Sequence, residues 1–131
     1  MAFDLRIITP EGTFLEDRVD SLTVKLTTGY RTILKGHYPL FGTLDFAPMH
    51  LMKGDNTMYY SLHGGVLRVN NDSVTIITSS IEHKNDIDLK RAMDSKARAE
   101  KRLSERLEET DIKRAELSLK RALSRIKTYN L

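Results

Sequence analysis

The composition of this 131-residue chain changes at Asp88, and that change limits the folds available to it. From Asp88 to the C-terminus there is no proline or glycine, and alanine, leucine, lysine, arginine and glutamate dominate. Because proline and glycine interrupt helices, their complete loss over this stretch favours long helices. The chain should therefore consist of two parts that differ in secondary structure.

The residues before this change form short β-rich runs separated by turn residues. Apolar and polar residues alternate from Val19 to Leu26, and two further runs flank Gly64-Gly65. The triplet Asn70-Asn71-Asp72 then turns the chain into the run Val74–Thr78. Short strands at about ten-residue intervals, with Gly, Pro and Asn between them, are typical of an antiparallel β-sandwich. We assign residues 1–84 to this domain.

The remaining residues, 85–131, carry the pattern of two amphipathic helices. Asp86 or Asp88 can cap the first helix, and Thr110 can cap the second. The polar break between the helices is short, so they should fold back on each other as an antiparallel hairpin. Apolar residues of the second helix recur at alternating spacings of three and four, which is the narrow seam of a helix that packs on another helix. They are Ile112, Ala115, Leu119, Ala122 and Ile126.

The energetics of this hairpin predict a weakly held appendage. Its seam offers few large apolar side chains, and alanines add little buried area. Ordering the backbone costs ~1–2 kcal/mol per residue, which helical hydrogen bonds offset only in part. We therefore expect a hairpin that needs the sandwich, a ligand or a partner to fold back, and that can adopt more than one arrangement.

Charge is distributed unequally between the two parts. Residues 1–87 contain 8 Lys/Arg and 10 Asp/Glu, whereas residues 88–131 contain 13 and 8, so the helical part is basic. Such a surface can bind nucleic acid, nucleotide phosphates or an acidic protein. With no cysteine and no ligand spacing among the four histidines, no metal site is predicted, and each histidine fits an ordinary surface or turn residue. No apolar run is long enough to cross a bilayer, and no nucleophile motif supports an enzyme.

One charged cluster admits two interpretations. Asp88 and Arg91 share the first turn of the first helix, and Arg121 and Arg125 should lie opposite them in an antiparallel hairpin. Arginines that converge at a helix N-terminus can bind a phosphate-like anion. The same residues also fit a solvated charged face with an N-cap and a local ion pair. The pair Gly64-Gly65 also admits two interpretations. It can form a phosphate cradle, or it can form a tight turn or a close contact between strands.

Four short motifs occur in an order and at spacings that resemble a known family. Residues 34–40 read Leu-Lys-Gly-His-Tyr-Pro-Leu, against the family pattern Leu-Pro-Gly-His-x-Pro-Leu. Residues 63–69 read His-Gly-Gly-Val-Leu-Arg-Val, against Ser-Gly-Gly-x-Leu-x-Val. Residues 87–92, Ile-Asp-Leu-Lys-Arg-Ala, and residues 113–117, Lys-Arg-Ala-Glu-Leu, complete the series. Together they resemble the epsilon subunit of F-type ATP synthase, of the bacterial type, over essentially the whole chain.

The resemblance implies an α+β fold, with an N-terminal antiparallel β-sandwich of about ten strands followed by a C-terminal antiparallel two-helix hairpin. It also implies a non-catalytic subunit of the rotating central stalk, peripheral on the cytoplasmic face of the bacterial plasma membrane and without direct membrane insertion. The sandwich, residues 1–84, would bind the gamma subunit and the membrane rotor ring of c subunits. The hairpin, residues 85–131, would be mobile; when extended it would reach the alpha and beta subunits and inhibit ATP hydrolysis.

Residue roles also follow from the resemblance. No cofactor is required, but a regulatory ATP would bind the compact hairpin. Its binding positions would be Glu82, Asp88, Arg91, Ala92, Arg98, Arg121 and Arg125. An acidic loop of the beta subunit would contact Lys113, Arg114, Lys120 and Arg121. The loop against the rotor ring would include Gly29, Tyr30, Arg31 and His37.

Departures from the family pattern concern the ring contact. Lys35 stands where proline is usual, and Tyr30-Arg31 stands where small or acidic residues are common. These changes should alter the docking surface and leave the fold intact. The alternative function is a basic helical nucleic-acid-binding module on a β-sandwich. In the first helix, however, acids interrupt the basic face, so we expect no nucleic acid among the partners.

Overall fold

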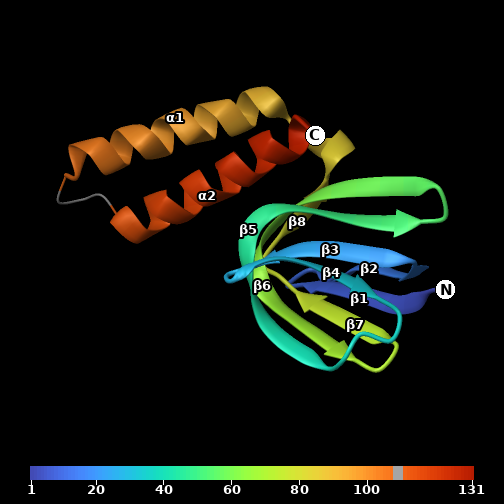
Figure 1. Cartoon of the computed structure of the whole chain (residues 1–131). Coiled ribbons are helices and arrows are strands. Elements are labelled where there is room, and N and C mark those ends of the chain that lie inside the picture. Colours follow the sequence, from blue (N-terminus) through green and yellow to red (C-terminus); the bar gives the residue numbers. More distant parts are fainter. Residues whose placement is uncertain (108–110) are drawn as a thin grey trace.

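The computed structural model describes residues 1–107 and 111–131 and places eight strands before two helices in that part of the chain (Figure 1). The strands are β1 (Phe3–Thr9), β2 (Gly12–Val19), β3 (Ser21–Leu26), β4 (Gly29–Leu34), β5 (Leu40–Lys53), β6 (Asn56–Asn70), β7 (Ser73–Ile77) and β8 (Ile81–His83). One 3-10 turn, Lys84–Asp86, leads into α1 (Leu89–Glu105), and α2 (Ile112–Tyr129) follows. The predicted β-sandwich with a C-terminal helical hairpin is confirmed.

The strands form one sheet that folds over on itself. Their order is β2-β1-β7-β6-β5-β3-β4, and β8 pairs with β6 beside this path. Among the described residues, every pairing is antiparallel except that of β1 with β7, which is parallel. The strands β5 and β6, 14 and 15 residues long, are much longer than the others and pair along most of their length. Because they run through the fold without a break, the described residues contain eight strands where about ten were expected.

Gly64 and Gly65 allow β6 to change partners. Before them, Tyr60–Leu62 pairs with β8; after them, Val66–Asn70 pairs with β7. Both glycines have positive φ, +73° and +114°, and a Cβ on Gly65 would lie 1.9 Å from the carbonyl oxygen of Ile77. The sequence places separate runs on either side of this pair, but the chain bends there and continues as one strand. The close-contact alternative for the two glycines is therefore correct, since backbone fills the space beside Gly65.

The main hydrophobic core lies inside the sandwich. Inward-facing residues alternate along the strands, as the period of two requires, and Phe3, Leu5 and Ile7 of β1 are at most 1% exposed. In the part of the chain that the structure describes, the large cluster of buried apolar side chains includes no residue of α1 or α2. The sandwich thus has a core that does not depend on the hairpin.

The two helices pack side by side and antiparallel (Figure 1). Ala92 and Ala99 of α1 are buried, as are Ala115 and Ala122 of α2, so each helix buries an alanine every seven residues. The larger members of the predicted seam are only half-buried: Ile112, Leu119 and Ile126. Small side chains let helices approach closely but remove little apolar surface from water. The hairpin therefore gains little stability from its own packing.

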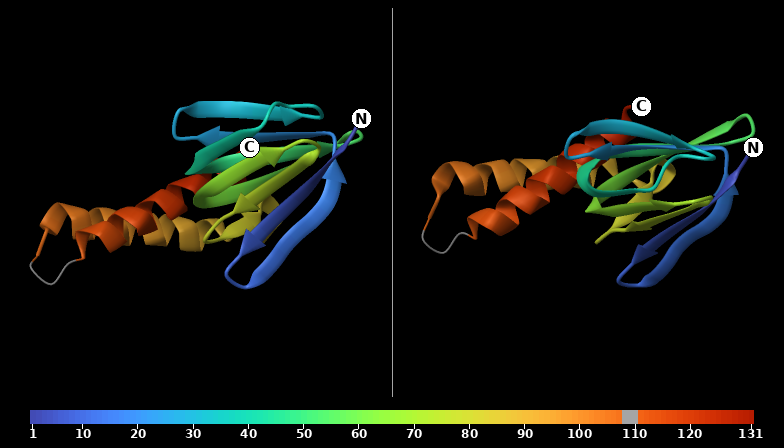
Figure 2. Two further views of the ribbon diagram at one scale, coloured as in Figure 1. Left: turned by 90° about the horizontal axis from the view of Figure 1, so that it is seen from below. Right: turned by 60° about the horizontal axis from the view of Figure 1, so that its bottom comes forward.

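Aspartates begin both helices. The Asp88 carboxylate accepts a hydrogen bond from the backbone N–H of Arg91 at 3.1 Å, and so caps α1. The Asp111 carboxylate accepts one from the N–H of Arg114 at 3.0 Å, and so caps α2. Thr110, the cap expected for α2, lies outside the described residues. Figure 2 shows the hairpin extending beyond the sheet, with α2 against β5 and β6 and α1 on the outer side of α2.

Candidate functional site

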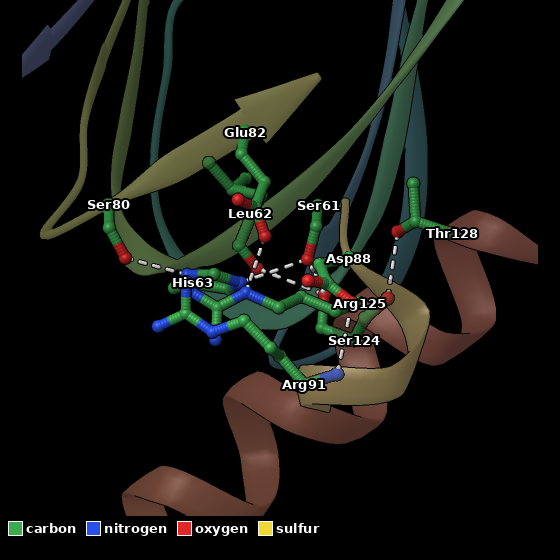
Figure 3. Close-up of polar contacts among 10 residues, drawn as sticks. All are labelled: Ser61, Leu62, His63, Ser80, Glu82, Asp88, Arg91, Ser124, Arg125 and Thr128. Atoms are coloured by element: carbon green, nitrogen blue, oxygen red, sulfur yellow. Dashed lines mark hydrogen bonds and ion pairs between the residues drawn. The ribbon is translucent and has the colours of Figure 1, made fainter. Parts of the chain in front are cut away.

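A small pocket lies where the start of α1, the end of α2 and strand β8 meet. Its volume is about 170 Å³, and its lining residues come from β8, the 3-10 turn, the first part of α1 and the end of α2. They are Glu82, Asp86, Asp88, Arg91, Ala92, Ser95 and Arg125. Figure 3 shows Glu82 of β8 and Arg125 of α2 reaching toward each other beside the start of α1. Because the walls belong to both domains, the pocket exists only while the hairpin is docked.

Five of the seven predicted nucleotide-binding residues line this pocket. They are Glu82, Asp88, Arg91, Ala92 and Arg125. The other two, Arg98 and Arg121, do not line it. Arg98 lies one turn further along α1, where its Nη2 donates to the Ser95 hydroxyl at 3.1 Å. Arg121 lies one turn before the lining residue of α2 and is half-buried.

Two lining residues were not predicted as part of the site. Asp86 was considered only as a helix cap, and its carboxylate lies in the turn that precedes α1. Ser95 follows Arg91 by four residues, so the two share one face of α1. That helical spacing is the sequence signal that could have identified Ser95.

The charges in the pocket are mixed. Arg125 Nε donates to Glu82 Oε1 at 2.5 Å, and both side chains are 31% exposed. Three carboxylates and two guanidiniums therefore share the lining. A bare anion would meet repulsion from the carboxylates, so the site suits a ligand with hydroxyl donors as well as a negative group. The volume is below the ~300–1,000 Å³ of common ligand pockets, so part of such a ligand would lie outside it.

A buried chain of hydrogen bonds joins α2 to the sandwich, and we call it the hydroxyl chain: Ser80, His63, Ser61 and Ser124 (Figure 3). The Ser80 hydroxyl lies 2.6 Å from His63 Nδ1, and His63 Nε2 lies 2.9 Å from the Ser61 hydroxyl. The Ser61 hydroxyl lies 2.8 Å from that of Ser124, which in turn donates to the Leu62 carbonyl at 3.5 Å. Thus a side chain of the hairpin completes a network inside the sandwich.

A neutral imidazole can complete the hydroxyl chain in either direction. One ring nitrogen donates to a neighbouring hydroxyl and the other accepts from one, and each serine hydroxyl can take either role. An imidazolium would donate from both nitrogens, so the hydroxyls of Ser61 and Ser80 would both have to accept.

His63 corrects one prediction from the sequence. An ordinary surface or turn position was expected, but the residue is 1% exposed because β6 carries it into the interface and α2 covers it. Burial, and then the charges of Arg125 and Arg121, lowers the pKa of His63 from 6.5 to about 3. The buried imidazole is therefore neutral at physiological pH.

In the docked hairpin, the four basic residues expected to contact an acidic loop have different surroundings. Lys113 and Arg114 are exposed on the first turn of α2. Further along, Lys120 Nζ lies 5.8 Å from the ring centroid of Phe46 on β5, and Arg121 is half-buried. The structure therefore does not bring all four to one free face while the hairpin is docked.

The predicted ring-contact residues are also divided. Gly29 begins β4 with φ +129°, and Arg31 Nη1 donates to the Tyr38 hydroxyl at 3.1 Å. The His37 ring stacks on that of Tyr38, with centroids 4.4 Å apart, so Tyr38 joins the two residues. Tyr30 points to the opposite face of β4, where its hydroxyl donates to a backbone carbonyl of β5 at 3.3 Å. Tyr38 is the missed member of this surface, and its place within the 34–40 motif was the available signal.

Comparison with known families accounts for both parts of the chain. The family described as ATP synthase, Delta/Epsilon chain, beta-sandwich domain matches residues 2–84, and the long alpha-helix domain of the same chain matches residues 85–130. The chain belongs to the ATP synthase delta/epsilon family. The resemblance expected from the four motifs is thereby confirmed.

Curated relatives of this family match along nearly their full length. The ATP synthase epsilon chain of Bacillus cytotoxicus is 40% identical, over 98% of this chain and 97% of its own length. The ATP synthase epsilon chain of Ruminococcus albus is 40% identical, over 98% of this chain and 96% of its own length. The ATP synthase epsilon chain of Caldicellulosiruptor saccharolyticus is 31% identical, over 95% of this chain and 91% of its own length.

Solved structures show the same fold. A chain in the mitochondrial ATP synthase of Euglena gracilis, in a structure of OSCP, F1 and c-ring, superposes with a TM-score of 0.79 at 21% identity, over 88% of this chain and 74% of that one. A chain in a structure of the central stalk and c-ring of the Tetrahymena thermophila mitochondrial ATP synthase superposes with a TM-score of 0.57 at 13% identity, over 97% of this chain and 92% of that one. At these identities the likeness concerns the fold alone.

Membership in the delta/epsilon family makes the chain a structural and regulatory subunit of the central stalk of ATP synthase, so the prediction of a non-catalytic subunit is confirmed. The alternative of a nucleic-acid-binding module receives no support from these relatives. Among the described residues, no helix combines the length and the apolar character needed to cross a membrane.

Proposed function

We propose that this chain couples the catalytic head of a bacterial F-type ATP synthase to its membrane rotor ring and restrains ATP hydrolysis through a mobile hairpin. The sandwich, residues 1–84, binds the gamma subunit and the ring of c subunits at the cytoplasmic face of the membrane. The hairpin, residues 85–131, inhibits when it extends toward the alpha and beta subunits. The observation that carries this proposal is the separation of the sandwich core from the hairpin.

Several polar contacts hold the docked hairpin on the sandwich, and such contacts can be exchanged, which supports its mobility. Besides the hydroxyl chain and the ion pair between Arg125 and Glu82, Lys84 Nζ donates to the backbone carbonyl of the C-terminal Leu131. Net contributions of such contacts are about 0.5–1.5 kcal/mol each, because water replaces them when they break. A partner that offers comparable contacts can therefore draw the hairpin away from the sandwich.

The extended hairpin would present a different basic surface. Release frees Lys120 from Phe46 and exposes Arg121, which then join Lys113 and Arg114 along α2. Six basic residues against the single acid Glu116 occur from residue 112 to residue 127. An acidic loop of the beta subunit complements this face.

The surface around Tyr38 is our candidate for the ring contact. Arg31 and His37 meet through this tyrosine, which is 62% exposed, and Tyr30 is 57% exposed on the other face of β4. Exposed aromatic side chains with an arginine among them are typical of protein interfaces. Contact through Arg31, His37 and Tyr38 together would leave Tyr30 at the rim.

We infer that ATP is a regulatory ligand of the pocket and is not a required cofactor. Glu82 and Asp88 supply acceptors for nucleoside hydroxyls, while Arg91 and Arg125 supply donors for phosphate oxygens. Arg98 and Arg121 lie one turn away along their helices and can reach a phosphate tail that leaves the pocket. Because the ligand would contact β8, α1 and α2 at once, it would stabilise the docked hairpin.

Removal of the hairpin tests inhibition. An ATP synthase assembled with the chain truncated before Asp88 should hydrolyse ATP faster than the complex with the full chain, while the sandwich remains folded and bound to gamma. Circular dichroism of the truncated chain and its co-purification with gamma are the controls. Unchanged hydrolysis in a complex that retains the truncated subunit would show that the hairpin does not inhibit.

Thermal unfolding of the full chain tests the nucleotide. At ten times its dissociation constant, ATP should stabilise the chain by ~1.4 kcal/mol, and Arg91→Ala should abolish this gain. The exposed Arg102 of the same helix provides the matched control, since Arg102→Ala leaves the pocket intact. Tripolyphosphate should stabilise less than ATP, because it cannot use the carboxylates. A missing shift at millimolar ATP, or a shift that survives in Arg91→Ala, would remove the assignment.

A further inference from the structure

His63 lies at the point of the sandwich that α2 covers. It is 1% exposed, its ring stacks beside that of Phe46 with centroids 6.2 Å apart, and it is the centre of the hydroxyl chain that ends on Ser124. When α2 leaves, it removes Ser124 and opens this side of the imidazole to water.

The charges that face His63 are mostly positive. From α2 come Arg121 and Arg125, and Lys120 of the same helix lies over the other ring of the stacked pair. From β8 comes the carboxylate of Glu82, but Arg125 already binds it. β6 and the segment before β8 contribute the neutral hydroxyls of the hydroxyl chain, and β5 contributes an aromatic ring. A positive charge on the imidazole would therefore be repelled by the positive charges of α2.

A proton on His63 would also break the order of the hydroxyl chain. A neutral imidazole accepts a hydrogen bond at one ring nitrogen, from Ser80 or from Ser61, so a proton added at that nitrogen would force the hydroxyl to turn away and donate elsewhere. The charge would sit in a site closed to water. In the released state, by contrast, water can solvate the imidazolium, and the arginines of α2 are no longer beside it.

We propose that His63 is a proton-sensitive latch, whose protonation drives the hairpin off the sandwich. This proposal rests on the mobile hairpin of the proposed function and adds the condition that moves it. Mild acid then favours the released, inhibitory arrangement, and neutral or alkaline pH favours the docked one.

The expected size follows from proton linkage. The docked chain holds His63 neutral down to about pH 3, whereas the released chain regains the ordinary pKa of 6.5. The docked state thus binds fewer protons, so the contribution of the neutral His63 to docking is fully present above pH 6.5 and is progressively lost as the pH falls toward 3. Between pH 7.5 and pH 5.5 the ratio of released to docked chain should rise about tenfold. Most carboxylates stay ionised over this interval.

Single-molecule energy transfer on the full chain measures that ratio. The chain has no cysteine, so Thr57→Cys in the sandwich and Ser104→Cys on α1, both at exposed positions, carry the two dyes selectively. We expect the tenfold rise in this labelled parent and less than a twofold change in His63→Ser. His50→Gln, a histidine of β5 outside the hydroxyl chain, is the matched control and should retain the tenfold rise. A rise that persists in His63→Ser would overturn the proposal.

A second measurement needs no substitution at His63. Side-chain NMR titration of the parent should show a neutral His63 in the docked chain at pH 5.5, and a docked His63 that titrates near pH 6.5 would overturn the proposal. Arg125→Gln, which breaks the pair with Glu82, should raise release at both pH values. If the parent ignores pH while Arg125→Gln still releases the hairpin, only the latch fails. If neither change moves the hairpin, its mobility fails as well.

Discussion

Replacement of Ser124 by alanine tests how the hairpin is held. Ser124 is 1% exposed on α2, and its hydroxyl shares a hydrogen bond with that of Ser61 at 2.8 Å. The substitution removes this bond and leaves the Ser61 hydroxyl without this partner in a buried site. Neither serine belongs to the core cluster of apolar side chains, although Leu62, whose backbone carbonyl Ser124 contacts, does. The effect should therefore appear in docking and not in the stability of the strands.

The magnitude follows from the buried hydroxyl. An unsatisfied buried donor costs about 1–3 kcal/mol, and alanine in place of serine returns roughly 0.5 kcal/mol through helix propensity. The net loss of about 0.5–2.5 kcal/mol lowers the ratio of docked to released hairpin by a factor of about 2–70.

Amide hydrogen exchange of the full chain is the assay. Exchange within α2 should accelerate about 2- to 70-fold, since protection depends on the free energy of local opening. The strands β1 and β7 should keep their protection. Ser118→Ala is the matched control, because Ser118 lies on the same helix, is only half-buried and gains the same helix propensity. Ser118→Ala should leave α2 protection unchanged or slightly higher.

Two results would refute this reasoning. Unchanged α2 protection in Ser124→Ala would mean that the hydroxyl chain does not hold the hairpin. Equal loss of protection in α2 and in the strands would mean that hairpin and sandwich open as one unit, which contradicts a separately mobile domain.

Two further predictions, one for each domain, separate the stability of the sandwich from that of the hairpin. Gly65→Ala should destabilise the sandwich by about 3 kcal/mol or more, since its Cβ would lie 1.9 Å from the Ile77 oxygen. Gly54→Ala, at φ +61° in open space, should cost only about 1–2 kcal/mol; equal losses in urea unfolding would contradict the close contact. Ala122→Leu overfills a fully buried position of α2 and should weaken docking by about 1–3 kcal/mol while leaving the urea midpoint of the strands unchanged. A lowered midpoint would show that α2 supports the core.

The division into sandwich and hairpin was predictable from sequence because its signals are local. Loss of proline and glycine after residue 88, together with the helical spacing of apolar residues, identifies helices without knowledge of their neighbours. The bend in β6 was not predictable in the same way. Gly64-Gly65 resembles a turn when considered alone, and only the carbonyl of Ile77, which another strand brings close, shows why glycine is required.

The candidate site shows the same limit. Asp88, Arg91 and Arg125 could be placed together from antiparallel geometry and helical spacing. The pairing of Arg125 with Glu82 depends on where β8 ends, and the burial of His63 depends on which strand α2 covers. Neither is encoded within a short window of sequence. For that reason His63 was expected at the surface and lies at 1% exposure instead.

The docked and extended arrangements of the hairpin should exclude each other because they use the same side chains. Lys120 contacts Phe46 and Arg125 binds Glu82 in the docked form, and Arg121 is half-buried beside them. An acidic partner that claims these residues must first take them from the sandwich, so partner binding and docking are linked by mass action. A ligand that fills the pocket holds Arg125 on the sandwich and so opposes binding of the acidic partner. A proton on His63 repels the same helix and so favours binding of that partner. One weakly held helix can thus combine several signals, provided that its docking free energy stays within a few kcal/mol of zero.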